Sequence, residues 1–132
     1  MTADYLYELA DIEHGYGEFR LRIPSLNILR NSSVGLAGPN GSGKSTLLRL
    51  LSFLEYPEKG VVRFNGKIHG RPLVTLLQQD PYLLKRTVYD NVAYGLRAAK
   101  DTGNLKNRVA EALEIVNLDH KKFIHRKWFE LS

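Results

Sequence analysis

Apolar residues in the first half of the chain recur in short runs and in alternation with polar residues. Residues 4–12 mix tyrosine, leucine and acidic side chains and predict a strand, with a turn at residues 14–17. Between residues 19 and 23, apolar side chains alternate with arginine, which predicts a half-buried strand that ends at Pro24. Further apolar runs predict strands at residues 34–37, 61–66 and 73–77 and a helix at residues 47–54.

The second half of the chain changes to a helical pattern. Thr87 followed by Asp90 resembles a capping box, and apolar residues then recur at helical spacing as far as Ala99. After a break at residues 101–104, a second apolar stripe runs from Leu105 to Val116 and predicts an amphipathic helix. We therefore expect a nucleotide-binding core with antiparallel strands at residues 1–81 and a helical subdomain at residues 82–132.

The segment between the strand predicted at 34–37 and the helix that follows has the character of a phosphate-binding loop. It fits G-x-x-x-x-G-K-[ST] at every fixed position. Its glycines let the backbone curl so that several N–H groups point at one anion, and the following helix adds its unpaired N-terminal N–H groups. Lys44 would reach the β- and γ-phosphates of a nucleotide, and the Ser45 hydroxyl would bind Mg²⁺. The residues expected to hold the phosphates are Gly38, Pro39, Asn40, Gly41, Ser42, Gly43, Lys44, Ser45 and Thr46.

The amino-acid composition favours some kinds of ligand and excludes some kinds of binding site. The 132 residues suffice for one modest core, and the net charge of +5 is spread along the chain, which suits an anionic ligand such as a nucleotide. The absence of cysteine excludes disulfides and thiolate metal sites. No apolar run is long enough for a membrane span, and the N-terminus does not resemble a signal peptide. The four histidines show no metal-ligand spacing and are expected to be surface imidazoles.

The residues after the last predicted strand point to a family. Gln78-Gln79-Asp80-Pro81 follows the apolar run directly, and Thr87-Val88 and Asn91-Val92 come soon after. This segment resembles the Q-loop of ABC-type ATP-binding cassettes. The final residues, Trp128 to Ser132, are similar to the opening of that family's signature, Leu-Ser-Gly-Gly. The resemblance implies an α/β fold, namely a P-loop NTPase with an ABC-type cassette core, a mixed sheet with an antiparallel β subdomain, and part of a helical subdomain.

The same resemblance implies roles for individual residues. Tyr16 would stack on the adenine of ATP. Ser45 and Gln79 would bind Mg²⁺, and Gln79 would also sense the γ-phosphate, which makes Lys44 and Gln79 the catalytic residues. Ser132 would face the γ-phosphate of ATP bound to a second cassette, and residues 82–90 would meet the coupling helix of a membrane permease.

The resemblance also implies a setting for the complete protein. It would be a cytoplasmic ATPase subunit, peripheral to the inner face of the cell membrane, that forms a homodimer of cassettes. Membrane permease subunits and a solute-binding protein would complete an importer. Residues 84–96 and 126–128 are similar to cassettes of oxyanion importers, tungstate or molybdate in particular.

One departure from the family pattern leaves alternatives open. The family's Mg²⁺-binding aspartate, water-activating glutamate and switch histidine all follow the signature, so we expect a truncated cassette that cannot hydrolyse ATP by itself. Asp80 and Asp119 each end an apolar run, but neither context suits a replacement metal ligand. A nucleotide-binding module without hydrolysis is one alternative. An ABC-type ATPase that acts on nucleic acid is another, although the sequence shows no aromatic and basic groove and we expect no nucleic acid.

Overall fold

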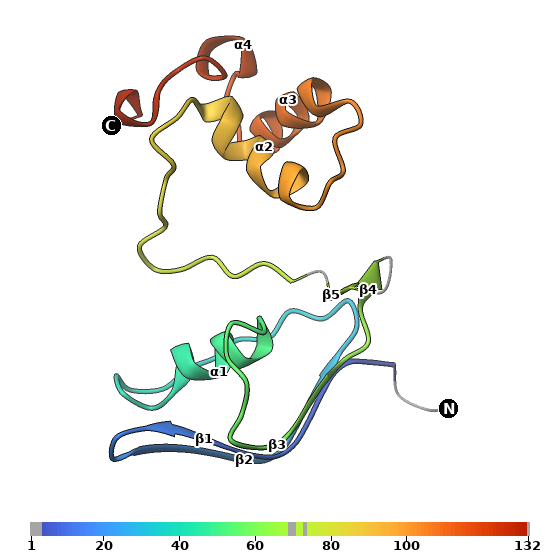
Figure 1. Ribbon diagram of the computed structural model, residues 1–132, viewed down its shortest axis with the longest axis vertical. Coiled ribbons are helices and arrows are strands. Elements are labelled where there is room, and N and C mark those ends of the chain that lie inside the picture. Colours follow the sequence, from blue (N-terminus) through green and yellow to red (C-terminus); the bar gives the residue numbers. More distant parts are fainter. Residues whose placement is uncertain (1–3, 69–70, 73, 132) are drawn as a thin grey trace. The chain divides into compact units, whose positions relative to one another are not determined.

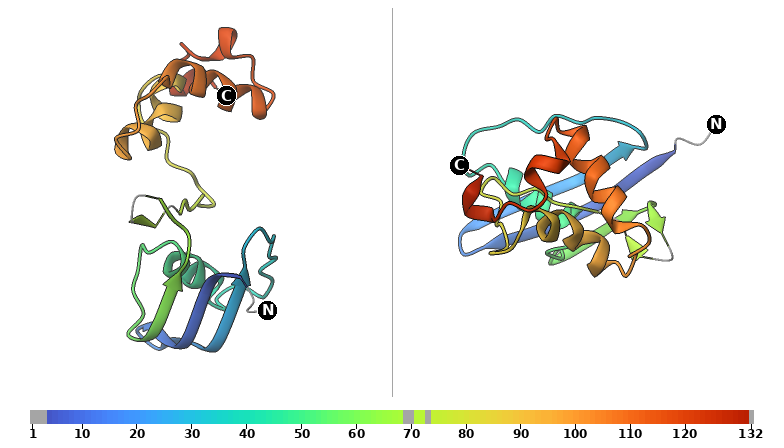
Figure 2. Two further views of the ribbon diagram at one scale, coloured as in Figure 1. Left: turned by 90° about the vertical axis from the view of Figure 1, so that its right-hand side faces the viewer. Right: turned by 90° about the horizontal axis from the view of Figure 1, so that it is seen from above.

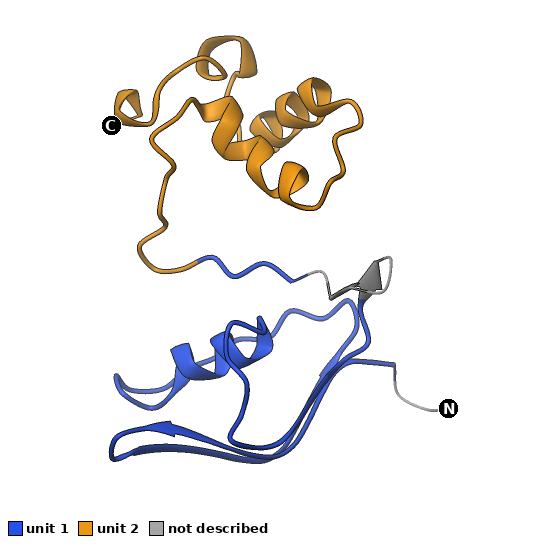
Figure 3. Cartoon of the chain, in the orientation of Figure 1, with its two compact units in different colours: residues 1–77 blue, residues 78–132 orange. Residues whose placement is uncertain are grey.

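The computed structural model describes residues 4–68, 71–72 and 74–131. The chain folds as two compact units, residues 1–77 and 78–132 (Figures 1 and 3). Among the described residues, the first unit contains five strands and one helix, and the second contains helical elements. None of the described helices is long and apolar enough to cross a membrane.

The first unit is built on a three-stranded antiparallel sheet with the strand order β2-β1-β3. Its strands are β1 (Tyr5–Tyr16), β2 (Phe19–Leu29) and β3 (Lys59–Phe64), which lie side by side in the left view of Figure 2. A short hairpin of β4 (Lys67–Ile68) and β5 (Arg71–Pro72), which the sequence did not predict, follows. The strands predicted from residues 4–12, 19–23 and 61–66 are confirmed with shifted bounds.

The prediction that Pro24 ends its strand is wrong. β2 continues to Leu29, and Pro24 falls between the register pairs that join Ile23 to Ile12 and Ser25 to Ala10. Because β2 is an edge strand, a residue without an N–H is tolerated there. The turn predicted at residues 14–17 is also displaced, since β1 runs to Tyr16 and the turn lies at residues 17–18.

Helix α1 (Lys44–Leu51) packs against this sheet. Leu47 and Leu50 of the helix form one buried cluster with Tyr7, Leu9 and Ile12 of β1. The Tyr7 hydroxyl donates to the Leu51 carbonyl at 2.8 Å and so fixes the end of the helix. The predicted helix at 47–54 is confirmed, but it begins and ends three residues earlier than its apolar run because Lys44 already lies in its first turn.

Two predicted central strands do not form. Residues 34–37 and 74–77 are irregular, and residue 73 lies outside the described residues. Val34, Leu36 and Leu77 are exposed. A strand requires a neighbour that accepts and donates its ladder hydrogen bonds, and no described strand pairs with either segment. For the same reason the strand pairs described here are all antiparallel, where a mixed sheet was expected.

The second unit packs its helices around a separate core. Its elements are α2 (Val88–Ala98), α3 (Leu105–Ile115), α4 (His120–Phe123) and a 3-10 turn at Trp128–Glu130. The buried residues are Val88, Ala93, Val109, Leu113 and Ile124. The predicted start of α2 is confirmed, because the Thr87 hydroxyl accepts from the Asp90 amide at 3.1 Å and donates to the Asp90 carboxylate at 2.8 Å.

Candidate functional site

The Gly-rich loop leads directly into helix α1. Gly43 precedes the helix with φ of 93°, a left-handed conformation that favours glycine, and no side chain caps the helix there. The first helical hydrogen bond runs from the Leu47 amide to the Gly43 carbonyl at 2.9 Å. The amides of the first turn, from Lys44 onward, therefore have no partner within the helix and can bind an anion.

The predicted phosphate-binding residues form one exposed stretch around this turn. Residues 38–42 and Ser45 are exposed, whereas Thr46 is buried at 8% exposure beneath the loop. The Lys44 Nζ atom donates to the carbonyl oxygens of Gly38 and Pro39, at 2.7 Å each. The ammonium group therefore lies over the curled backbone, where the charge of a phosphate would be compensated.

The β1–β2 hairpin ends against this loop. A Cβ atom on Gly43 would lie 3.0 Å from Leu21 Cδ1 and 3.1 Å from Phe19 Cζ, so a larger residue would displace the hairpin. Phe19 pairs with Tyr16 across the turn. The geometry thus brings Tyr16, predicted as the adenine-stacking residue, to the end of the sheet that adjoins the phosphate loop.

Tyr16 belongs to a polar cluster that sequence reasoning missed. Its hydroxyl donates to the Glu55 carboxylate, and His14 Nε2 lies 3.3 Å from Glu55 Oε2 and 3.4 Å from the Tyr16 hydroxyl. Tyr16 is 47% exposed. His14 is buried, which corrects its prediction as a surface imidazole, and its ring meets the Tyr16 ring edge-on with centroids 5.3 Å apart.

The titration of this cluster follows from its hydrogen bonds. The bond from Tyr16 is the main reason that the pKa of Glu55 is lowered, with smaller contributions from His14 and Arg49. The same bond raises the pKa of Tyr16. Glu55 is therefore a carboxylate, and Tyr16 a neutral donor, across the physiological pH range. Residues 16 and 55 are far apart in sequence, so no local pattern could have identified the pair.

The other residues considered for the site belong to the second unit. Gln79 is exposed and belongs to the second unit, as does Asp80, so their part in a metal site remains a prediction. Asp119 caps α4, where its carboxylate accepts from the Lys121 amide at 2.9 Å. Ser132 lies outside the described residues.

A group of potential metal ligands in the second unit was not anticipated. One ligand atom each from Glu114, Asp119 and His120 lie within 4.8 Å of one another. The protein already satisfies them, because Glu114 accepts from His120 Nδ1 at 2.7 Å and from the His120 amide at 3.2 Å, while Asp119 caps its helix. Hydrogen bonding at the helix ends accounts for this cluster.

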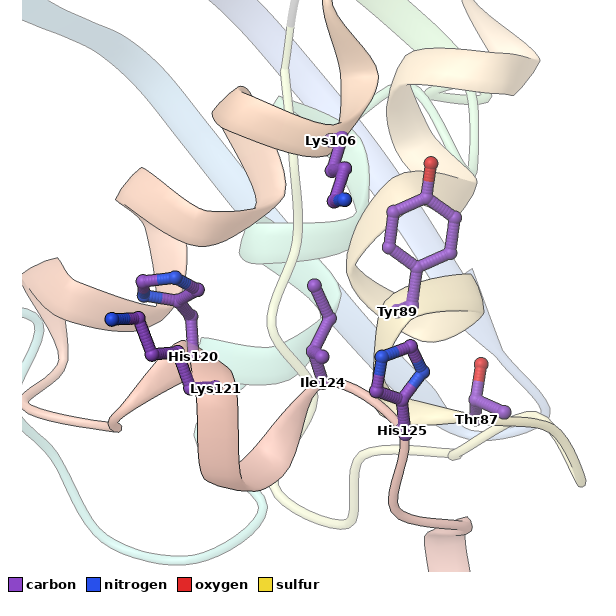
Figure 4. A pocket seen from close by; sticks show the side chains of 7 residues that line it. All are labelled: Thr87, Tyr89, Lys106, His120, Lys121, Ile124 and His125. Carbon is purple, nitrogen blue, oxygen red and sulfur yellow. The ribbon is translucent and has the colours of Figure 1, made fainter.

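The second unit also contains a cavity of about 530 Å³ (Figure 4). Its lining is largely basic, with two lysines and two histidines beside a threonine, a tyrosine and an isoleucine. The lining residues are Thr87, Tyr89, Lys106, His120, Lys121, Ile124 and His125. Ile124 lies among the polar side chains in Figure 4, with Tyr89 and His125 on one side. Thr87 and Tyr89 fall within residues 82–90, the segment expected to meet a permease.

Comparison with known proteins places these features in a family. The sequence pattern of the ABC transporter family matches residues 21–132. The sulfate/thiosulfate import ATP-binding protein CysA of Escherichia coli strain K12 is 37% identical over 125 residues, which cover 86% of this chain and 34% of that protein. The spermidine/putrescine import ATP-binding protein PotA of Nitrosomonas europaea is 35% identical, over 96% of this chain and 37% of that protein. The chain spans about a third of the length of these relatives.

Solved structures agree on the fold. A protein from Pyrococcus furiosus described as an ABC transporter ATP-binding protein superposes with a TM-score of 0.76 at 28% identity, covering 96% of this chain and 62% of that one. The cbiO1 protein from Clostridium perfringens gives 0.70 at 23% identity over 98% of this chain and 56% of that one, a likeness of fold alone. The fold is thus the P-loop NTPase fold of ABC cassettes. Since the family pattern covers most of its residues, the chain belongs to the ABC transporter family.

Proposed function

We propose that this chain binds Mg·ATP through the loop from Gly38 to Thr46 as the ATP-binding part of an import ATPase. The observation that carries the proposal is the loop's geometry: an uncapped helix start after a left-handed Gly43, with the Lys44 ammonium folded over the loop carbonyls. The loop amides and Lys44 would hold the phosphates. Free amide donors and a positive charge in one exposed loop are the groups that would bind a triphosphate, and packing of a hydrophobic core does not require them.

The adenine and the metal would be held by other residues. Tyr16 pairs with Phe19, whose ring adjoins Gly43 of the loop, and its 47% exposure would leave room for a base to stack on it. The exposed Ser45 hydroxyl fits Mg²⁺, which prefers oxygen ligands and retains several waters. When bound, Mg²⁺ would neutralise phosphate charge. Gln79 completes the predicted ligand set and, with Lys44, would act in hydrolysis.

The role in import rests on the relatives. CysA and PotA are both named import ATP-binding proteins, and cbiO1 is described as part of the ABC transporter complex cbiONQ. We propose that the complete protein works as a homodimer of cassettes on the cytoplasmic face of the membrane, with permease subunits and a solute-binding protein. The basic cavity lined by Thr87 and Tyr89 is the proposed contact with the permease.

The most specific part of the proposal is the identity of the transported solute. We propose an oxyanion. Within that class, the relatives' names favour sulfate or thiosulfate, and they give no support to the tungstate or molybdate predicted from residues 84–96 and 126–128. The polyamine named for PotA is the competing cargo. Uptake of radiolabelled sulfate, molybdate and spermidine by cells with and without the gene would separate the three.

Titration calorimetry with Mg·ATP tests the central part of the proposal. Lys44→Ala is expected to weaken binding at least tenfold, about 1.4 kcal/mol or more. Lys59→Ala is the matched control, because Lys59 lies in the same unit and its Nζ atom forms a largely solvent-exposed ion pair with Glu13, at 2.9 Å. Equal affinity of the Lys44 and Lys59 variants would refute the loop as the nucleotide site.

A further inference from the structure

The Tyr16 hydroxyl is held from the far end of the helix that carries the phosphate-binding lysine. Helix α1 begins at Lys44 and ends at Leu51. Beyond it, the amides of Leu54 and Glu55 donate to the Arg49 carbonyl at 3.0 and 3.4 Å, which fixes the backbone of Glu55 to the last turn. The backbone of Glu55 is therefore tied to the same helix whose first turn follows the phosphate loop.

Within this frame the Glu55 carboxylate has two roles. One oxygen, Oε2, accepts from Tyr16 and lies 3.3 Å from His14 Nε2, and the other, Oε1, lies 3.6 Å from Arg49 Nη1. The Glu55 side chain is 25% exposed and that of Arg49 is 50% exposed. An ion pair as exposed as this one adds little, so the hydrogen bond to Tyr16 is the more specific contact.

A stacking residue benefits from being held. A free tyrosine at a hairpin end samples several rotamers, and a base that binds it must fix one of them, at a cost in side-chain entropy. Here the hydroxyl is tied to Glu55, and His14 packs edge-on against the same ring. Tyr16 nevertheless stays 47% exposed.

We infer that Glu55 is the positioning residue of the adenine-binding tyrosine: its carboxylate fixes the Tyr16 ring at a set distance from the phosphate loop and so selects nucleotides that carry a base. The inference rests on the proposed binding of Mg·ATP. It assigns Glu55 a role in binding the base and none in binding the phosphates.

The test compares Mg·ATP with inorganic triphosphate, which has the phosphates but no base. Glu55→Ala is expected to weaken Mg·ATP binding about threefold to tenfold, the cost of ordering one free side chain, and to leave triphosphate binding unchanged. Tyr16→Phe removes only the hydroxyl and is expected to have the same effect. The double variant should be no weaker than either single variant, because both remove one interaction. Glu55→Gln keeps an acceptor and should retain most of the affinity.

Glu58→Ala is the matched control, because Glu58 is an exposed acid in the same connection after α1. Three outcomes would overturn the inference: unchanged Mg·ATP affinity in Glu55→Ala and Tyr16→Phe, an equal loss for triphosphate, or additive losses in the double variant. If Glu55→Ala fails to fold, the exposed Tyr16→Phe decides alone. Failure of the proposed function has another signature, since neither ligand would then bind the unaltered chain in a manner that depends on Lys44.

Discussion

Asn91 is expected to stabilise the second unit well beyond the usual contribution of a helix-surface residue. Its Oδ1 atom accepts from the Leu84 amide at 2.8 Å, and its Nδ2 atom donates to the carbonyls of Leu84 and Thr87 at 3.0 and 2.9 Å. A typical hydrogen bond contributes about 1 kcal/mol net, and water can replace some of these because the site is only half buried. Asn91→Ala should therefore lower the free energy of unfolding by about 2 kcal/mol.

Urea unfolding followed by the fluorescence of Trp128, the only tryptophan, measures this loss. The Trp128 amide donates to the Arg86 carbonyl at 3.1 Å, so the indole reports on the segment that Asn91 holds. With a slope of about 2 kcal/mol per M, the midpoint should fall by about 1 M. Asn107→Ala, on the exposed face of α3, is the control and should be neutral or slightly stabilising, because alanine has the higher helix propensity. A change of less than about 0.5 kcal/mol for Asn91→Ala would show that these three hydrogen bonds do not hold the segment.

Two further predictions concern catalysis and pH. In the complete protein, Gln79→Ala should lower the rate of ATP hydrolysis more than ATP affinity, because a metal contact matters most as charge develops in the transition state; a larger effect of Gln78→Ala in steady-state kinetics of the same protein would show that the register is wrong. Hydrogen bonds from His120 lower the pKa of Glu114 below its ordinary 4.5. A lowered pKa stabilises the fold above the ordinary value and loses this effect as pH falls through the folded-state value. The melting temperature should therefore fall more steeply below pH 4.5 in the unaltered chain than in Glu114→Gln, and parallel curves would contradict this.

Features set by neighbouring residues could be predicted from the sequence. The Gly-rich loop depends on spacing within a few residues, and α1 follows it as expected. The Thr87 cap is equally local, and the structure shows both of its hydrogen bonds to Asp90. The alternation after Phe19 correctly gave a strand. In each case the physical cause lies within one turn or one strand.

Features set by distant residues could not be predicted. Pro24 is tolerated because β2 is an edge strand, and the position of a strand in the sheet depends on pairing that no local sequence pattern reveals. The apolar runs at 34–37 and 74–77 have strand propensity, but propensity cannot supply a pairing partner. The Glu55 contact with Tyr16 joins residues on different elements, so only the fold reveals it.

The nucleotide site is tested most directly by recording the backbone amide signals of the chain by NMR while Mg·ATP is added. The largest shifts are expected at the amides of Gly41, Gly43, Lys44 and Ser45, because these groups would bind the phosphates, and the base should shift Tyr16 and its neighbours. Inorganic triphosphate should reproduce the loop shifts without those at Tyr16. Shifts confined to the basic cavity of the second unit, or none at all, would contradict the claim that this loop is the nucleotide site.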